Sequence, residues 1–342
     1  MAITSIKEIA QLANVSASTV SRVLNGKTYV NEKTREKVLK VINDNNFKPN
    51  IVAQSLKNGQ VNTICLMVTS ISNPIFPLIA RGVEDVARDN GYTVVLCNID
   101  EKSDVEKAYI ENMKNRYIAG FVIASATEDE EHIYKLASEN YPTVLVNRYH
   151  KEDLNKLNII GIDNNNAGYD ATKYLIDLNH KRIAIAVGDE KLYFYQERLN
   201  GYLRALKDNG IEVDENLIMH STTDDFSQQV VNLMQLEDKP TAIFATSDPK
   251  AISIMHNLRE LGIKIPEDVS IIGLDNVDMS RIIYPTLTTI SQPLYQFGRE
   301  AAKSVIQQIE YKKTHGGNLP ASKTLILEHE LIVRDSTIRR CE

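Results

Sequence analysis

Cysteine is scarce in this sequence of 342 residues. Only Cys65, Cys97 and Cys341 occur, and their spacing matches neither a zinc site nor a disulfide framework. Such sparse use of cysteine fits a reducing compartment. Cys65 and Cys97 fall within apolar runs, where a thiol usually acts as a small buried side chain. We therefore expect plain buried thiols and no metal held by cysteine.

Long apolar runs are also missing. No run reaches the roughly 18–20 residues that a membrane-spanning helix requires. The N-terminal stretch lacks the basic region followed by apolar residues that marks a secretory signal. These two observations predict a cytoplasmic protein without membrane contact.

Motifs of nucleotide binding and hydrolysis do not occur either. No strand-like run is followed by Gly-x-Gly-x-x-Gly, and Gly-x-x-x-x-Gly-Lys-Ser/Thr is absent. The chain also lacks His-Glu-x-x-His and Gly-x-Ser-x-Gly, and its seven histidines are scattered. We therefore expect no enzyme activity, no cofactor and no metal site.

Charge is unevenly distributed between the beginning of the chain and the rest. Residues 1–60 contain nine Lys and Arg and four acids, whereas the other 282 residues contain 30 and 41. A basic head on an acidic body is expected if only the head meets a polyanion. Chance clustering on a solvated face would give the same balance, so charge alone leaves nucleic-acid binding open.

Three short helices are predicted within the basic head. Ser5 and Glu8 form a capping box, after which apolar residues recur at helical spacing. Ser16 is the next candidate N-cap, and the helix that it begins covers residues 17–24. Asn31 can cap a third helix. This order of elements is typical of a helix-turn-helix unit.

The second of these helices is predicted to enter the DNA major groove. Ala17 and Ser18 are small enough for close approach to the bases, and Arg22 can donate two hydrogen bonds to guanine. The alternative is a three-helix core that binds nothing, with Arg22 as a surface ion-pair partner. The predicted DNA contacts in the head are Ser16, Ala17, Ser18, Thr19, Ser21, Arg22 and Asn25.

From about residue 61 short apolar runs alternate with amphipathic helical stretches. Such alternation predicts an α/β body of parallel sheets covered on both faces. The pattern occurs once before about residue 161 and again after it, which indicates two similar doubly wound lobes. The runs predicted as strands are Thr63–Thr69, Tyr92–Ile99, Gly120–Ala124, Thr143–Asn147, Asn158–Asp163, Arg182–Val187, Thr241–Thr246 and Val269–Asp275.

The first sixty residues resemble the DNA-binding head of the lac and gal repressor family. The residues that carry the resemblance are Ile6–Ala10, Val15–Asn25, Thr34–Val38, Phe47–Asn50 and Ala53–Leu56. The remaining chain resembles periplasmic sugar-binding proteins, with three crossings between the lobes. The resemblance implies base contacts at positions 17, 18 and 22, a homodimer and a palindromic operator.

A hinge is predicted between head and body. Ile51–Lys57 could form two helical turns, but so short a helix is not stable alone in water. The resemblance implies that the DNA minor groove and the partner's hinge order it, with Leu56 as the apolar wedge that opens a base step. Packing of Leu56 on the body is the alternative. The predicted hinge contacts with DNA are Asn50, Ala53, Gln54, Leu56 and Lys57.

These considerations divide the chain into three parts. The head covers residues 1–48, the hinge and linker 49–60, and the body, which binds the effector and dimerises, 61–342. The first lobe is expected to hold residues 61–161 and 293–322, and the second 162–291 and 323–342. The crossings are expected near Ile160–Asn164, Ile290–Leu294 and Ala321–Leu325.

Polar residues at the ends of strands are the candidates for effector binding, because ligands of open α/β sheets lie beyond the carboxyl ends of the strands. Asp163 and Asp275 end such runs, and Asp248 follows one. Arg198 and Gln292 complete a set that suits a polyhydroxylated ligand, since carboxylates accept from hydroxyls and arginine donates a fork. Each of the five could instead be a helix cap or a bridge between lobes.

The resemblance adds Phe76, Asn147 and Arg148 to this set. Phe76 could pack on the apolar face of a sugar ring. Arg148 together with Arg198 could admit a carboxylate or phosphate, or Arg148 could bridge to an acid. The segment Tyr193–Tyr195 is more aromatic than the resemblance leads us to expect. Whether it narrows the pocket stays open.

We therefore predict a sequence-specific transcriptional repressor of a carbohydrate-utilisation operon. A small sugar-like effector between the lobes would control its affinity for the operator. The first alternative is a catabolite-control regulator that responds to a phosphorylated carrier protein; Arg81–Asp85 resembles such members but is too common to decide. An enzyme fused to a DNA-binding head is a second alternative, opposed by the missing catalytic motifs.

Overall fold

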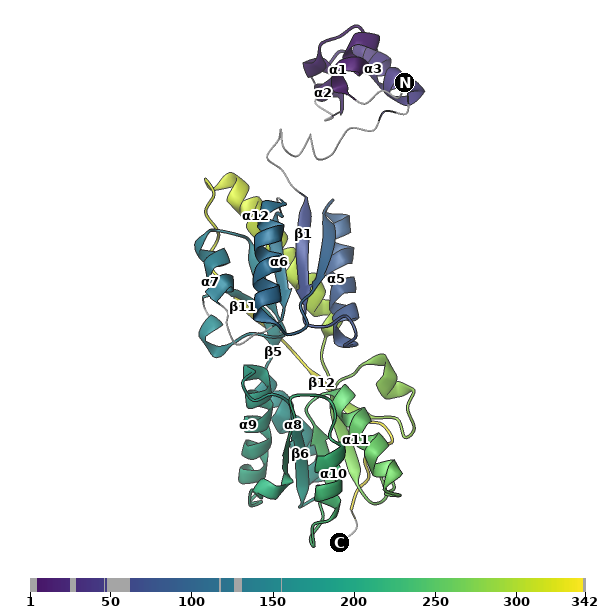
Figure 1. Cartoon of the computed structure of the whole chain (residues 1–342), viewed down its shortest axis with the longest axis vertical. Coiled ribbons are helices and arrows are strands. Elements are labelled where there is room, and N and C mark those ends of the chain that lie inside the picture. The colour runs from purple at the N-terminus through teal and green to yellow at the C-terminus, as the bar shows by residue number, and fades with distance from the viewer. Residues whose placement is uncertain are drawn as a thin grey trace. The chain divides into compact units, whose positions relative to one another are not determined.

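The structure of the chain is a computed structural model, drawn in Figure 1. It describes residues 5–24, 29–45, 47, 62–116, 118–125, 131–154 and 156–340. The chain forms two compact units, Met1–Val61 and Asn62–Glu342, which are described here one at a time. The predicted hinge, residues 49–60, lies outside the described residues.

The head contains the three predicted helices. They are α1 (Ile6–Leu12), α2 (Ala17–Leu24) and α3 (Glu32–Asp44). The capping box is confirmed, because Ser5 Oγ accepts from the Glu8 amide and the Glu8 carboxylate accepts from the Ser5 amide. Asn31 caps α3 by accepting from the Lys33 amide at 3.0 Å. The helices enclose a small apolar core of Ile9, Ala10, Ala13, Val20, Val23, Val38, Ile42 and Phe47.

The first lobe is a parallel sheet of six strands. In spatial order these are β11 (Thr324–Leu327), β5 (Asn158–Ile162), β4 (Thr143–Val146), β3 (Gly120–Ala124), β1 (Thr63–Val68) and β2 (Thr93–Asn98). Alternate residues of β1 belong to two apolar cores, one on each face of the sheet. The first core also contains residues of α5 (Ile75–Asp89) and α12 (Leu294–Thr314). The second contains residues of α6 (Ser103–Asn115) and α7 (Glu131–Ser138). Burial on both faces explains why β1 is apolar throughout.

The second lobe repeats this plan with one reversed strand. Its order is β12 (Glu330–Ile332), β10 (Thr288–Ser291), β9 (Ser270–Asp275), β8 (Ala242–Ala245), β6 (Ile183–Val187) and β7 (Ile218–His220). Only β12 runs antiparallel among these described strands. One face packs on α8 (Asn164–Asp177) and α9 (Tyr193–Asp208), and the other on α10 (Ser227–Met234) and α11 (Asp248–Glu260). The doubly wound α/β architecture is confirmed.

The chain crosses between the lobes three times. Two crossings lie where they are predicted, between β5 and α8 and between β10 and α12. The third prediction, at Ala321–Leu325 with the second lobe starting at 323, is wrong. β11 pairs in parallel with β5 and so extends the first sheet, which moves the crossing to residues 328–329. The yellow end of the chain passes there from one lobe to the other (Figure 1).

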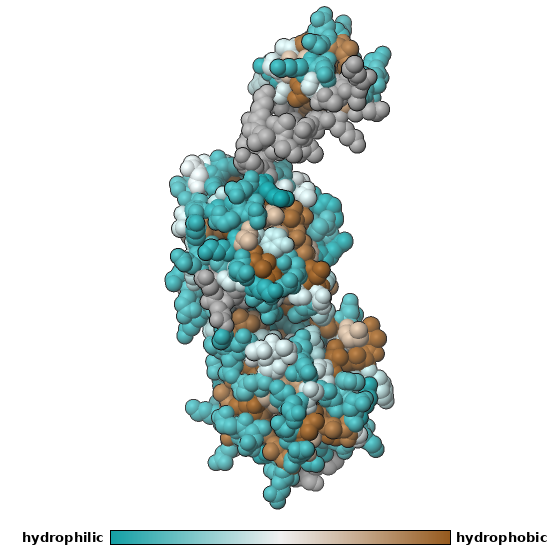
Figure 2. All heavy atoms as spheres, in the orientation of Figure 1, coloured by the Kyte–Doolittle hydropathy of each residue, from teal (hydrophilic) through white to brown (hydrophobic). Residues whose placement is uncertain are grey.

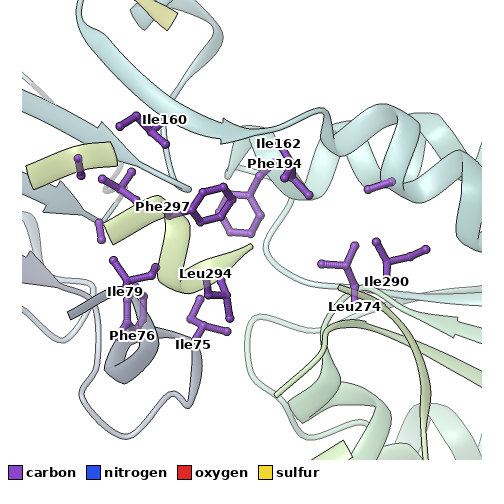
Figure 3. Close-up of a cluster of buried hydrophobic side chains, with 14 of the residues drawn as sticks. Ile75, Phe76, Ile79, Ile160, Ile162, Phe194, Leu274, Ile290, Leu294 and Phe297 are labelled. Carbon is purple, nitrogen blue, oxygen red and sulfur yellow. The ribbon is translucent and has the colours of Figure 1, made fainter. Parts of the chain in front are cut away.

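One apolar core runs through both lobes. It joins α5 and α12 side chains of the first lobe to β9 and β10 side chains of the second. Figure 3 shows Phe194 beside Ile162, between Ile75 and Leu294 on one side and Leu274 and Ile290 on the other. The two lobes are therefore in continuous apolar contact across their junction.

Glycines let the paired helices of each lobe approach closely. A Cβ on Gly298 of α12 would lie 2.0 Å from the Ile79 carbonyl oxygen of α5. A Cβ on Gly201 of α9 would lie 2.1 Å from the Asn165 carbonyl oxygen of α8. Any side chain at either position would force the helices apart.

The sequence predicts no membrane span, no metal site and buried free thiols, and each prediction can be compared with the residues that the structure describes. None of its helices is long and apolar enough to cross a membrane. Its His, Cys, Asp and Glu residues include no group of three or more that could hold a metal ion. Cys65 and Cys97 are buried free thiols, as predicted, with sulfur atoms 3.7 Å apart. Cys341 lies outside the described residues.

Candidate DNA-reading helix and ligand cleft

The outer face of α2 carries the small and polar side chains predicted to meet DNA. Val20 and Val23 face the core, whereas Ala17, Ser18 and Arg22 are exposed. Thr19 and Ser21 are half-buried. Arg22 forms no ion pair within the described residues. These contacts therefore do not support the alternative in which Arg22 is a surface ion-pair partner.

The N-terminal end of α2 is held by its own hydroxyls. Ser16 Oγ accepts from the Thr19 amide at 3.2 Å, as an N-cap does. The same oxygen lies 2.7 Å from Ser18 Oγ and 2.8 Å from Thr19 Oγ1. These contacts fix three candidate DNA-contacting side chains before any ligand arrives. The other candidates, Asn25, Asn50, Ala53, Gln54, Leu56 and Lys57, lie outside the described residues.

A cleft of about 490 Å³ lies between the two lobes of the body. Its walls are the segments that follow β1, β2 and β4 in the first lobe and β6, β7 and β8 in the second. It therefore occupies the carboxyl edges of both sheets, where open α/β folds bind ligands. The lining residues are Thr69, Ser70, Ser72, Asn73, Pro74, Asp100, Glu101, Arg148, Asp189, Leu192, Tyr195, Thr222, Thr223, Asp224, Pro249 and Lys250.

Arg148 is the only predicted effector residue among those that line the cleft in the described part of the body. Its Nη1 donates to Glu101 Oε1 at 3.1 Å, which is the bridge to an acid that the sequence left open. Phe76 is 1% exposed and packs in the first-lobe core, with the Arg148 guanidinium 5.5 Å from its ring centre. A sugar platform at Phe76 is therefore not available in this arrangement; the ring that lines the cleft is Tyr195.

The predicted residues Arg198, Asp275 and Gln292 are buried in the body. Gln292 Nε2 donates to Asp275 Oδ1 at 2.6 Å. Arg198 donates to Asn164 Oδ1 at 2.9 Å and to the Thr246 carbonyl at 2.6 Å, and lies 5.8 Å from the Tyr195 ring centre. Burial lowers the pKa of Arg198, and Asp275 opposes that shift. These three side chains do not line the cleft, and their contact with an effector stays a prediction.

The remaining three predicted residues have different surroundings. Asp248 is fully buried and accepts from Thr289 Oγ1 at 2.6 Å and from the Val277 amide at 2.9 Å. Both of its carboxylate oxygens therefore bind within the second lobe. Asp163 is an exposed N-cap of α8, and Asn147 is buried with φ of 63° at the end of β4. Contact of any of these residues with an effector stays a prediction.

The aromatic segment at the start of α9 contacts the first lobe. The Phe194 ring centre lies 5.2 Å from the guanidinium of Arg148 in the first lobe and 5.2 Å from that of Arg198 in the second. Tyr193 lies 6.0 Å from the Tyr149 ring across the junction. A ring between two guanidinium groups is stabilised by the attraction of both cations to its face. This segment therefore joins the lobes.

Several buried polar atoms around the cleft have no hydrogen-bond partner. Among the described residues they include Thr69 Oγ1, Asn147 Oδ1, Arg148 Nε, Ser247 Oγ and Gln292 Oε1. All five residues follow the carboxyl end of a strand, as the cleft does. Of the five residues, Thr69 and Arg148 line the cleft. Because buried polar groups are nearly always paired, their unpaired atoms indicate a place for a polar ligand or bound water.

The buried acids predict a pH dependence of stability. Burial, together with repulsion from Asp275, raises the pKa of Asp248 to about 7, well above the ordinary 3.8. The folded protein then holds a proton that the unfolded chain loses above about pH 4, so the free energy of unfolding falls as pH rises from about 4 to about 7. Asp248→Asn should reduce this decrease by on the order of 1 kcal/mol or more.

Denaturant unfolding at pH 5 and pH 8 measures this difference. The exposed Asp208→Asn is the control, because it removes the same charge without changing a buried acid. If the free energy of unfolding changed with pH equally in wild type and in Asp248→Asn, Asp248 would ionise in the folded protein as it does in water.

The chain matches two descriptions of known protein families. Residues 5–50 match bacterial regulatory proteins of the lacI family. Residues 61–329 match periplasmic binding proteins and the sugar binding domain of the LacI family.

Curated relatives match along nearly the whole chain. The HTH-type transcriptional regulator RegA of Clostridium acetobutylicum is 37% identical over 335 residues, which are 97% of this chain and 98% of that protein. Catabolite control protein A of Priestia megaterium is 33% identical over 335 residues, with the same coverage of 97% and 98%.

Solved structures also match along nearly the whole chain. The lac repressor dimer bound to operator and the anti-inducer ONPF is 25% identical, with a TM-score of 0.85 over 98% of this chain and 99% of that one. A complex of the transcriptional regulator CelR with cellobiose is 27% identical, with a TM-score of 0.74 over 98% of this chain and 100% of that one.

Proposed function

Because the chain belongs to the LacI family of bacterial transcriptional regulators, we propose that it represses transcription under the control of a small polyhydroxylated effector. The effector would bind in the cleft between the lobes. The observation that carries the proposal is that hydroxyl, amide and carboxylate side chains line this cleft together with two unpaired buried polar atoms, Thr69 Oγ1 and Arg148 Nε. The cellobiose bound by the similar CelR supports a carbohydrate as the ligand class.

Operator recognition is proposed for the exposed face of α2. Arg22 would contact guanine, and Ala17 and Ser18 at the helix start would allow the close approach that this contact requires. A homodimer would place two such helices on a palindromic operator, as the operator-bound dimer of the similar lac repressor suggests. The hinge contacts predicted from Asn50 to Lys57 rest on the family resemblance alone. The protein would act in the cytoplasm, without catalysis.

Control by the effector would act through the angle between the lobes. Phe194 and Tyr195 come from one helix; Phe194 contacts Arg148 of the first lobe, and Tyr195 lines the cleft. A ligand that contacts Tyr195 can therefore shift the segment that joins the lobes. Since only differential affinity for two lobe arrangements moves the equilibrium, the effector must bind one arrangement more tightly.

Replacing Arg22 by Ala should weaken operator binding by about 1–3 kcal/mol, because a bidentate contact to guanine is lost. Arg22→Lys keeps the charge but not the planar fork, so it should lose most of the same specificity. Fluorescence anisotropy at fixed salt, with operator and random duplexes, measures both. Lys40→Ala on α3 is the control for loss of charge alone. An equal loss on both duplexes in Arg22→Ala would contradict a role in reading bases.

The effector proposal is tested by thermal shift on the full-length protein with a panel of mono- and disaccharides. A ligand that binds only the folded state raises the melting temperature. Stabilisation by at least one carbohydrate, reduced by Tyr195→Ala, is the expected result. No shift with any sugar, combined with a shift by a phosphorylated carrier protein, would favour the second candidate. That candidate has a specific support in the similarity to catabolite control protein A.

A further inference from the structure

We propose that the cleft selects a hydroxylated ligand that carries an ammonium group and no anionic group. The inference rests on the proposed function and narrows its effector to a chemical class, the amino sugars and related amino polyols. It follows from how the charged side chains of the cleft are paired with one another.

The lining of the cleft is acidic on balance. Four carboxylates face two cations among its lining residues: Asp100, Glu101, Asp189 and Asp224 against Arg148 and Lys250. An uncharged sugar does not need this excess, and an anionic sugar would be repelled by it. A positive group on the ligand would compensate it.

Both cations already have carboxylate partners within the cleft. Arg148 Nη1 lies 3.1 Å from Glu101 Oε1, and its guanidinium also stacks over the Phe194 ring. Lys250 Nζ lies 2.6 Å from Asp224 Oδ1 and 5.1 Å from the Tyr195 ring centre. An incoming carboxylate or phosphate would have to displace an acid from each cation. Breaking such a pair while its lysine or arginine is largely buried is costly.

The two remaining acids have no cationic partner. Asp100 and Asp189 form no ion pair with any residue in the described part of the chain. Asp100 follows β2 in the first lobe, and its left-handed backbone, with φ of 52°, turns the chain at the cleft. Asp189 follows β6 in the second lobe and accepts from the Lys191 amide at 3.0 Å. A cation in the cleft would therefore be attracted by both lobes.

Unpaired buried atoms give independent evidence that a polar ligand fits here. Thr69 lines the cleft, is 2% exposed, and its hydroxyl has no partner. Arg148 lines it as well, is 5% exposed, and its Nε–H has no acceptor. Ligand hydroxyls can donate and accept, so they satisfy both groups. The Tyr195 ring offers an apolar face beside these polar groups.

Calorimetry on the full-length protein tests the inference with matched ligands. Glucose, galactose, mannose and cellobiose are each compared with their amino, N-acetylamino and phosphorylated counterparts at neutral pH. We expect at least one amino sugar to bind about tenfold or more tightly than its parent, because a charge-assisted hydrogen bond is added. N-acetylation should abolish this preference, since it removes the charge at the same atom.

The variants Asp100→Asn and Asp189→Asn should lower the ratio of amino-sugar to parent-sugar affinity, by about tenfold for the double variant. Asp208→Asn, exposed at the end of α9, should leave the ratio unchanged. Parent sugars or sugar phosphates that bind as tightly as the amino sugars would overturn the inference and leave a sugar-controlled repressor standing. Failure of every carbohydrate to bind would overturn the sugar-controlled repressor as well.

Discussion

Phe194→Ala should lower the free energy of unfolding by about 3–5 kcal/mol, the usual cost of deleting a buried aromatic ring. The ring is 5% exposed, and its centre lies 5.2 Å from the guanidinium groups of both Arg148 and Arg198. Its removal would leave a cavity at the lobe junction and would abolish the attraction of both cations to the ring. Denaturant unfolding of the full-length protein at neutral pH measures the loss.

Phe194→Leu separates the two contributions of the ring. Leucine keeps most of the apolar volume but offers no face to the guanidinium groups, so we expect a loss of about 1–2 kcal/mol. A small aromatic compound such as indole should raise the melting temperature of Phe194→Ala and leave wild type unchanged, because it can refill the cavity. A stability of Phe194→Ala equal to that of wild type would show that the lobes do not depend on this ring.

Ile282→Asp should convert the proposed homodimer into monomers at concentrations at which wild type self-associates. Figure 2 shows apolar side chains gathered on one flank of the second lobe. In the segment after β9, Met279 is 49% exposed, Ile282 74% and Tyr284 84%. Exposed apolar groups of this kind mark interaction surfaces. A buried unpaired carboxylate should weaken association at least about hundredfold.

Sedimentation analysis over a range of protein concentrations measures this change. Val213→Asp introduces the same charge at another exposed apolar position of the second lobe and should leave the dimer intact. Operator affinity of Ile282→Asp should fall in parallel, since a monomer contacts only half of a palindrome. Unchanged association in Ile282→Asp would place the dimer contact elsewhere on the body.

How well each strand could be predicted from the sequence depended on its length as well as on its burial. The strands that lie inside the sheets and are buried on both faces, such as β1, β3 and β9, carry continuous apolar runs and were predicted to within a residue or two. The strands β7, β10, β11 and β12 were missed because each is only three or four residues long; β7, β11 and β12 also lie at sheet edges, with β11 largely exposed. Missing β11 also displaced the third crossing, because a strand of this kind has no pattern that differs from a loop.

The position of the cleft was predicted from the sequence, but most of the residues that line it were not. The rule that ligands lie beyond strand ends points to the edge of both sheets at which the cleft lies. Applied to every strand, it would also have selected Asp100 after β2 and Asp189 after β6, which do line the cleft. Whether a polar side chain at a strand end turns into the cleft or inward depends on tertiary packing. Asp248 and Asp275 turn inward, and nothing in their sequence neighbourhood distinguishes them from Asp100.

The late position of β11 has a consequence for synthesis. The first lobe contributes five strands by residue 162, but the sixth, which covers β5, is made only at residues 324–327. At ordinary rates of translation the edge of β5 stays uncovered for about ten seconds or more while the second lobe emerges from the ribosome. An uncovered strand edge can pair with the edges of other chains. Nascent chains should therefore depend on chaperones during this interval, and truncation before residue 324 should produce aggregates.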